Sequence, residues 1–126
     1  MSKILQKPIV YLESTDILQD GSIVNSTLLS KNIPIVLMIQ ANYCGYCTMA
    51  KPEFQSFANQ TQGKVSCATI QGDLKLEGVS NINNVKELYP DFKGYPYYIL
   101  FNSSGKRVPR EIQSRDMNGL KSFVGL

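Results

Sequence analysis

The chain has 126 residues, of which 43% are apolar and 18% charged, so its length and composition fit one globular domain spanning residues 1–126. It contains no histidine and only three cysteines. These counts exclude Ser-His-Asp and Cys-His catalysis, metal sites that need imidazole, and a disulfide-rich secreted scaffold. The net charge of +3 arises in residues 91–126, where six dispersed basic side chains outnumber three acidic ones. We therefore expect a solvated surface there and no nucleic-acid partner.

No segment has the pattern of a signal peptide or a membrane span. Lys3, Gln6, Lys7 and Pro8 interrupt the start of the chain, and the apolar runs at 35–39 and 97–101 have only the length of a strand. The sequence therefore predicts a cytoplasmic protein with no membrane partner. Packaging into a virus particle is also compatible with it.

The first half of the chain alternates short strands with helices. Residues 9–12 predict a strand, and Ser22 is a candidate N-cap for a helix that ends before Pro34. The continuous apolar run at 35–39 predicts a central strand that is covered on both faces. Residues 65–70 predict a second such strand. We expect the two to be parallel, because a helix with an apolar stripe crosses between them (Ala50, Phe54, Phe57, Ala58).

The second half predicts a polar loop at 72–84 and a short helix capped by Asn84. A strand at 97–101, a return strand near 108–112 and a final amphipathic helix capped by Asp116 follow. The order β-α-β-α-β-α-β-β-α predicts an α/β fold. Its mixed central sheet has four or five strands, with helices on both faces.

Two cysteines stand at the expected start of the helix after the central strand. With two residues between them, Cys44 and Cys47 lie close enough in a first helical turn to form a disulfide. The N-terminus of a helix presents unpaired N–H groups and the positive end of its dipole, which favours the thiolate of Cys44. Cys44 is therefore the candidate nucleophile, and Cys47 the candidate thiol that resolves a mixed disulfide.

Three other interpretations fit such a pair: half of a metal site, an inert structural disulfide, or a pair without chemistry in a binding domain. A zinc or cluster site needs ligands from a second subunit or from carboxylates, because Cys67 is the only other cysteine. A disulfide that closes so short a loop constrains the unfolded chain little. We expect no metal and no bound cofactor. Cys67 alternates with Val65 and Thr69 along one strand face, which favours a core residue over a regulatory thiol.

Two segments resemble the thioredoxin superfamily. Residues 41–54 (Ala-Asn-Tyr-Cys-Gly-Tyr-Cys-Thr-Met-Ala-Lys-Pro-Glu-Phe) resemble its active-site segment, including a proline inside the helix. Residues 92–96 (Phe-Lys-Gly-Tyr-Pro) resemble the loop that holds its cis-proline, which faces the cysteine pair. With Arg115 before the last helix, the chain is most similar to a protein disulfide isomerase catalytic domain, from about Ile9 to Val124.

The resemblance implies a thioredoxin-like fold and a role for each matching residue. Cys44 and Cys47 match the redox pair, and Arg115 is similar to an arginine that moves in to stabilise the second thiolate. Arg115 is equally a candidate for a plain surface cation. Further residues match positions that contact substrate (Tyr43, Gly45, Tyr46, Tyr95, Pro96). Tyr95 is expected to offer backbone groups to an extended substrate segment.

Two positions depart from the family pattern. Met38 occupies the place of a buried Asp or Glu that accepts the proton of the second cysteine, and Tyr46 replaces the histidine of isomerases or the proline of thioredoxins. A general base contributes roughly 10²–10⁴ in rate, so we expect slow resolution of mixed disulfides unless Arg115 or water compensates.

The sequence thus predicts a monomeric thiol–disulfide oxidoreductase that acts on protein disulfides and dithiols. Its redox partner is expected to be another redox protein or glutathione. The alternative is a non-catalytic binding or adaptor domain that uses a surface formed by Tyr95, Tyr97 and Tyr98.

Overall fold

The computed structural model describes residues 5–41, 44–72, 81–82 and 84–126. The elements along the chain are β1 (Val10–Tyr11), a 3-10 turn η1 (Ser14–Asp16), α1 (Ser26–Leu29), β2 (Ile35–Gln40), α2 (Gly45–Gln60), β3 (Ser66–Gln71), α3 (Val85–Leu88), β4 (Tyr97–Phe101), β5 (Arg107–Val108) and α4 (Met117–Val124). Within the described residues, no helix combines the length and the apolar character needed to cross a membrane. Most of the polar loop expected at 72–84 lies outside the described residues.

One mixed sheet organises the fold, with the strand order β1-β3-β2-β4-β5. β3 pairs in parallel with β1 and β2, whereas β4 is antiparallel to β2 and β5. All six residues of the central strand β2 are buried, as its continuous apolar sequence predicts. The predicted α/β class, the mixed sheet and the parallel pairing of the two long strands are confirmed.

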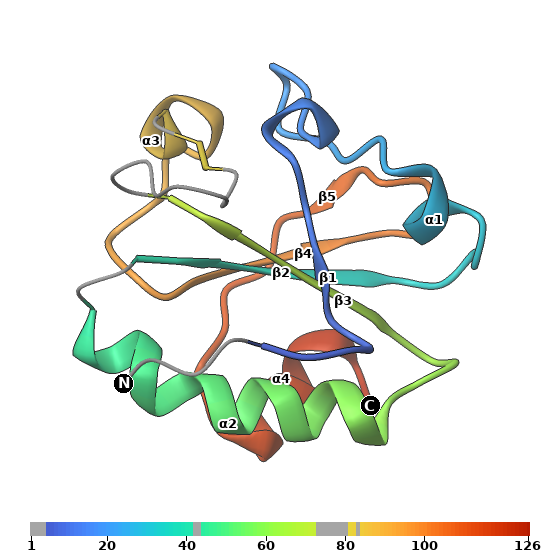
Figure 1. The fold of residues 1–126 in the computed structure, drawn as a ribbon, viewed down its shortest axis with the longest axis vertical. Coiled ribbons are helices and arrows are strands. Elements are labelled where there is room, and N and C mark those ends of the chain that lie inside the picture. Colours follow the sequence, from blue (N-terminus) through green and yellow to red (C-terminus); the bar gives the residue numbers. More distant parts are fainter. Residues whose placement is uncertain (1–4, 42–43, 73–80, 83) are drawn as a thin grey trace.

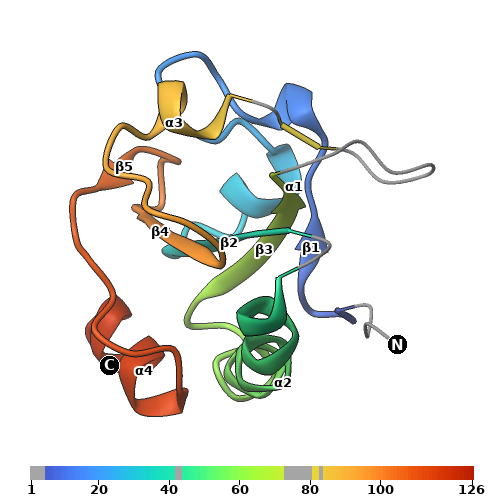
Figure 2. The ribbon, with the colours of Figure 1, turned by 90° about the vertical axis from the view of Figure 1, so that its left-hand side faces the viewer.

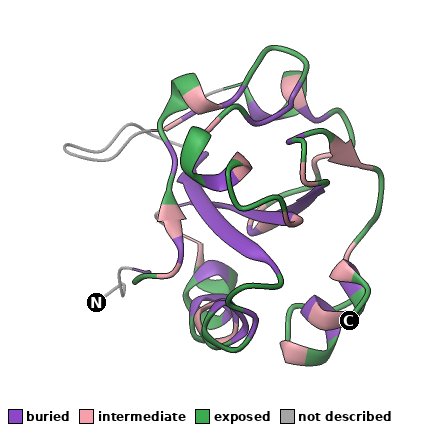
Figure 3. Cartoon of the chain, turned by 90° about the vertical axis from the view of Figure 1, so that its right-hand side faces the viewer, coloured by how far each residue is buried: buried purple, intermediate pink, exposed green. Residues whose placement is uncertain are grey.

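Helices cover both faces of this sheet (Figures 1 and 2). Side chains alternate along β2, so Leu37 and Ile39 face a cluster that includes Leu28 of α1 and Val85 of α3. Met38 faces the opposite cluster, which contains residues of α2 and α4 (Phe54, Phe57, Ala58, Leu120, Phe123). Figure 3 shows buried strands between helices whose outer sides are exposed. Each face of the sheet therefore has its own apolar core.

The first helix begins three residues later than predicted, at Ser26 with Asn25 as its cap. Ser22 does not cap it, because its hydroxyl donates to Asp20 and the next residue, Ile23, forms an isolated bridge with Ile17. The cap is Asn25, whose side-chain oxygen accepts a hydrogen bond from the Leu28 amide at 3.0 Å. Serine and asparagine both cap helices. Because Ile23 pairs with Ile17, the helix begins after that bridge, with Asn25 as its cap.

The return strand near 108–112 was also predicted too long, since β5 ends at Val108. The next residue is Pro109, which has no N–H to continue the ladder. Asn84 precedes α3 as expected, although its side chain makes no capping bond. Asp116 caps α4 as predicted and accepts a hydrogen bond from the Gly119 amide at 2.8 Å.

Two contacts hold the segment before α4 against its neighbours. The Glu53 carboxylate of α2 accepts a hydrogen bond from the Met117 amide, at the start of α4, at 3.0 Å. Gly119 lies so close to Ser114 that a Cβ at position 119 would overlap the Ser114 carbonyl group and hydroxyl. These contacts fix the ends of the short stretch that carries Arg115.

Candidate active site

Cys44 stands at the N-cap of α2, at the end of the connection from the central strand. Its Sγ accepts a hydrogen bond from the Cys47 amide at 3.1 Å and donates one to the Tyr95 carbonyl oxygen at 3.3 Å. The side chain is partly exposed, and no disulfide involves any of the three cysteines. Cys44 is thus a thiol that solvent reaches, held by a helix start on one side and by a loop on the other.

Cys47 lies one turn further into α2 and is only 1% exposed. Burial raises the pKa of its thiol to about 12, and the hydrogen bond with Cys44 adds to this effect. The Ala41 amide and the Lys51 charge act in the opposite direction but are weaker. At neutral pH the Cys47 thiol therefore keeps its proton while Cys44 faces the solvent.

The loop before β4 supplies the other side of the site. The peptide bond between Tyr95 and Pro96 is cis, and Pro96 is buried. The Tyr95 ring contacts Phe92, with centroids 5.0 Å apart, and its hydroxyl donates to the Gly72 carbonyl. A Cβ at Gly72 would overlap the Tyr95 ring and the Ile39 side chain. Gly72 therefore allows the Tyr95 ring to lie against the end of β3, while the Tyr95 carbonyl points to Cys44.

A groove of about 720 Å³ is lined by Tyr46, which stands between the two cysteines in the sequence, by this loop and by residues 110–115. Tyr46 borders it and is 66% exposed. The Arg115 guanidinium lies over the Tyr46 ring, 5.6 Å from its centroid, within the range of a cation–π interaction. Gly45 is also exposed at this helix start, whereas Tyr43 lies outside the described residues. The structure thus brings Arg115 beside Tyr46, one of the two residues between the cysteines.

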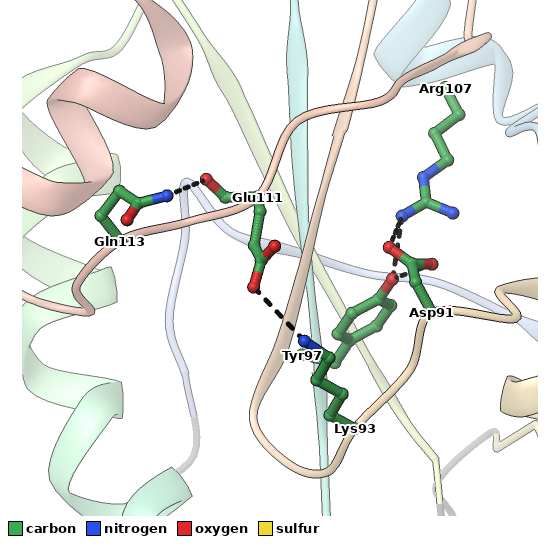
Figure 4. Close-up of polar contacts among 6 residues, drawn as sticks. All are labelled: Asp91, Lys93, Tyr97, Arg107, Glu111 and Gln113. Atoms are coloured by element: carbon green, nitrogen blue, oxygen red, sulfur yellow. Dashed lines mark hydrogen bonds and ion pairs between the residues drawn. The ribbon is translucent and has the colours of Figure 1, made fainter.

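Charged side chains line the far part of the groove (Figure 4). Arg107 donates to the Asp91 carboxylate and to the Tyr97 hydroxyl, both at 2.8 Å, and Tyr97 donates to Asp91 at 2.7 Å. The hydrogen bond from Arg107 holds the pKa of Asp91 below its usual value. Lys93 lies 3.8 Å from the Glu111 carboxylate, in an exposed and weaker ion pair.

These contacts change the interpretation of the three tyrosines. The Tyr97 hydroxyl is held in the Arg107 network, the Tyr95 hydroxyl is bonded to Gly72, and Tyr98 is 3% exposed. The three tyrosines line one groove, in which Tyr98 is largely buried and the hydroxyls of Tyr95 and Tyr97 are bonded within the chain. A binding surface formed by them stays a prediction of the sequence.

The place expected for a buried acid is apolar. Met38 is fully buried in the core under α2. Among the described residues, the groups that influence the Cys47 pKa are Cys44, Ala41 and Lys51, and none of them is a carboxylate. The described residues also contain no cluster of three His, Cys, Asp or Glu side chains that could hold a metal ion.

Sequence reasoning did not place Lys51 or Tyr98 near the cysteine pair. Lys51 is only 9% exposed and follows Cys47 by four residues, a spacing that places both on one side of a helix and could have identified it. Tyr98 lies opposite Met38 in the β2–β4 ladder, which local sequence does not reveal. Cys67 is buried in the core under α2, and burial raises its pKa to about 12.

Comparison with known proteins shows the family to which the chain belongs. The family model described as thioredoxin matches residues 17–125. The chain belongs to the thioredoxin family. One relative is described as "Putative thioredoxin-like protein 453L" of Invertebrate iridescent virus 6. It is 33% identical over 135 residues, which cover 97% of this chain and 96% of the viral protein.

Solved structures share the fold at low identity. Human ERp44 form I aligns with a TM-score of 0.68 and 17% identity over 98% of this chain, which spans 30% of the ERp44 chain. The first thioredoxin domain of mouse protein disulfide-isomerase A4 aligns with a TM-score of 0.64 and 17% identity, covering 91% of this chain and 71% of that one. The Trx4 domain of ERdj5 aligns with a TM-score of 0.57 and 20% identity, covering 95% of each chain. The resemblance to isomerase-type domains is confirmed at the level of the fold.

Proposed function

We propose that this protein is a thiol–disulfide oxidoreductase that acts on protein substrates through Cys44 and Cys47. The observation that carries the proposal is the environment of Cys44. Its partly exposed Sγ lies at a helix N-cap, bonded to the Cys47 amide and to the carbonyl that precedes Pro96. An accessible thiol with a second thiol one turn behind it is the arrangement that thiol–disulfide exchange requires.

In the reducing direction, the Cys44 thiolate attacks one sulfur of a substrate disulfide and expels the other as a thiolate. The resulting mixed disulfide is attacked by the Cys47 thiolate, which forms the Cys44–Cys47 disulfide and releases the second substrate thiolate. The two protons lost by the cysteines pass through water to the released thiolates. Two electrons then return from another redox protein or from glutathione. The groove beside Tyr46 and Arg115 receives the substrate segment.

The direct test is insulin reduction with dithiothreitol as electron donor. We expect Cys44→Ser to abolish activity and Cys47→Ser to accumulate mixed disulfides that non-reducing electrophoresis resolves. Cys67→Ala is the matched control, because Cys67 is buried on the sheet away from α2's first turn and should leave the rate unchanged.

A protein that binds substrates without reducing insulin, and whose Cys47→Ser variant traps no partner, would instead be a binding or adaptor domain. The direction of electron flow follows from a redox titration against glutathione, in which 30 mV corresponds to about 1.4 kcal/mol for a two-electron couple. A cytoplasmic location and a monomeric state remain predictions of the sequence, testable by fractionation and by sedimentation.

A further inference from the structure

A buried hydroxyl near the active site lacks a partner. Tyr98 is 3% exposed, and its hydroxyl makes no hydrogen bond within the described part of the chain. The other fully enclosed tyrosine, Tyr89, donates its hydroxyl to the Gly21 carbonyl at 2.9 Å. An unpaired buried hydroxyl destabilises the folded state. A hydrogen-bond partner that arises only during the reaction would explain why this position has one.

The surroundings of Tyr98 place this hydroxyl near the second cysteine. Tyr98 is the direct cross-strand partner of Met38, and its ring packs edge-on against Phe54 with centroids 5.9 Å apart. Phe54 lies two turns after Cys47 on the buried side of α2. Tyr98 also lines the groove that Arg115 borders. Its side chain therefore lies between the sheet and α2, toward the side of the helix on which Cys47 is buried.

Electrostatic interactions agree with this placement. Burial is the main cause that raises the Tyr98 pKa above its ordinary value; a negative charge on Cys47 raises it further, while the Arg115 charge lowers it. The phenol therefore stays protonated at neutral pH and is a hydrogen-bond donor, not a base. Besides burial, the groups that act on the Cys47 pKa are Cys44, the Ala41 amide and Lys51.

We propose that Tyr98 belongs to the catalytic site, where its hydroxyl donates a hydrogen bond to the Cys47 sulfur when that sulfur becomes a thiolate. The inference rests on the proposed oxidoreductase function and concerns its second step. Cys47 loses its proton to water in the groove, and its thiolate attacks the Cys44 sulfur of the mixed disulfide. The bond from Cys44 to the substrate breaks, the Cys44–Cys47 bond forms, and the substrate leaves as a thiolate that takes a proton from water. The family pattern has an acid at the position of Met38 that assists the second cysteine. In this chain Tyr98 assists it instead, by stabilising its thiolate.

The test separates the two steps with 5,5′-dithiobis(2-nitrobenzoate). Attack by Cys44 releases one thionitrobenzoate, and attack by Cys47 on the resulting mixed disulfide releases a second. Both phases are followed by absorbance from pH 7 to 9 in a Cys67→Ala background. The variants are Tyr98→Phe and the matched control Tyr89→Phe, which removes a buried hydroxyl on the opposite face of the sheet.

We expect Tyr98→Phe to slow the second phase at least about tenfold, as for the loss of a hydrogen bond to a charged group. Its pH profile should move about one unit to higher pH, while the first phase and both phases of Tyr89→Phe stay at wild-type rates. An unchanged second phase, or an equal slowing of both phases, overturns the role of Tyr98 and leaves the oxidoreductase function standing. Release of a single equivalent by the unsubstituted site overturns the proposed function itself.

Discussion

Placing a carboxylate at position 38 is the sharpest perturbation of this site. Met38 is fully buried under α2 and directly opposite Tyr98, so Met38→Glu puts an acid below the cysteine pair. The matched control is Met38→Gln, which has nearly the same shape and buries a polar group but cannot accept a proton as a base.

Two magnitudes decide the expected outcome. With a pKa of about 12, only about one Cys47 thiol in 10⁵ is ionised at pH 7. A positioned base that takes this proton is worth roughly 10²–10⁴ in rate. Burying the new polar group costs about 1–3 kcal/mol, in part offset because the unpaired Tyr98 hydroxyl can donate to it. The loss in stability lowers the free energy of unfolding and not the rate of the folded protein. The gain in rate is therefore measurable in the folded variant.

The assay is the second thionitrobenzoate phase, together with insulin reduction between pH 6 and 8. Met38→Glu should resolve the mixed disulfide at least about tenfold faster than Met38→Gln, a conservative part of the range for a general base. Urea unfolding of both variants shows whether they carry a similar loss of stability. Equal rates in two folded variants would refute the argument that this position lacks a base.

Three further predictions concern the pH dependence of Cys47, the packing of Gly119 and the carboxylate of Asp91. Because the Cys47 pKa is about 12, its thiolate fraction and the rate of the second phase should rise about tenfold per pH unit between pH 7 and 9, as stopped-flow absorbance can measure. Gly119→Ala should destabilise the protein by about 1–3 kcal/mol in urea, because overlap with Ser114 outweighs a gain of up to about 1 kcal/mol in helix propensity. The control is Asn118→Ala, an exposed position in the same helix, which should have no such cost. If Gly119→Ala stabilised the protein, the segment around Ser114 would have moved away from the new Cβ without cost. The lowered pKa of Asp91 contributes stability above its ordinary value of 3.8 that is lost as the pH falls through the folded-state value. Because this carboxylate is 60% exposed, Asp91→Asn should cost less than about 1 kcal/mol at pH 7 and flatten the acid side of the stability profile measured in urea.

The strands and the cysteine pair could be predicted because their signals are local. A continuous apolar run marked β2, and the partly apolar segment 65–70 marked β3. Two cysteines at the start of an amphipathic stripe marked the site. The start of α1 could not be chosen from the sequence, since Ser22 and Asn25 both have capping side chains. The choice depends on the bridge between Ile17 and Ile23, which is a tertiary contact.

From the residues alone only the cysteine pair could be located, whereas Tyr95, Pro96 and Arg115 were named from the resemblance to the family. Cys44 contacts the Tyr95 carbonyl, and Arg115 contacts the Tyr46 ring. Both contacts connect segments that are far apart in the chain, so no local pattern shows them. Alternation along β4 separates Tyr97 from Tyr98, but the sequence does not say which face α2 covers. The burial of Tyr98 follows from that packing, which local sequence does not reveal.

The hydrogen bond from Cys44 to the Tyr95 carbonyl ties one lone pair of that oxygen to the protonation state of Cys44. In the dithiol protein the thiol proton occupies that oxygen. Once Cys44 ionises or joins a mixed disulfide, it has no proton to donate, and the bare sulfur and the carbonyl oxygen repel each other at this separation. The oxygen then becomes available to a backbone N–H of an incoming polypeptide. In the proposed reaction, the step that turns Cys44 into a nucleophile therefore also frees a hydrogen-bond position for the substrate, and that position is filled again when Cys44 regains its proton.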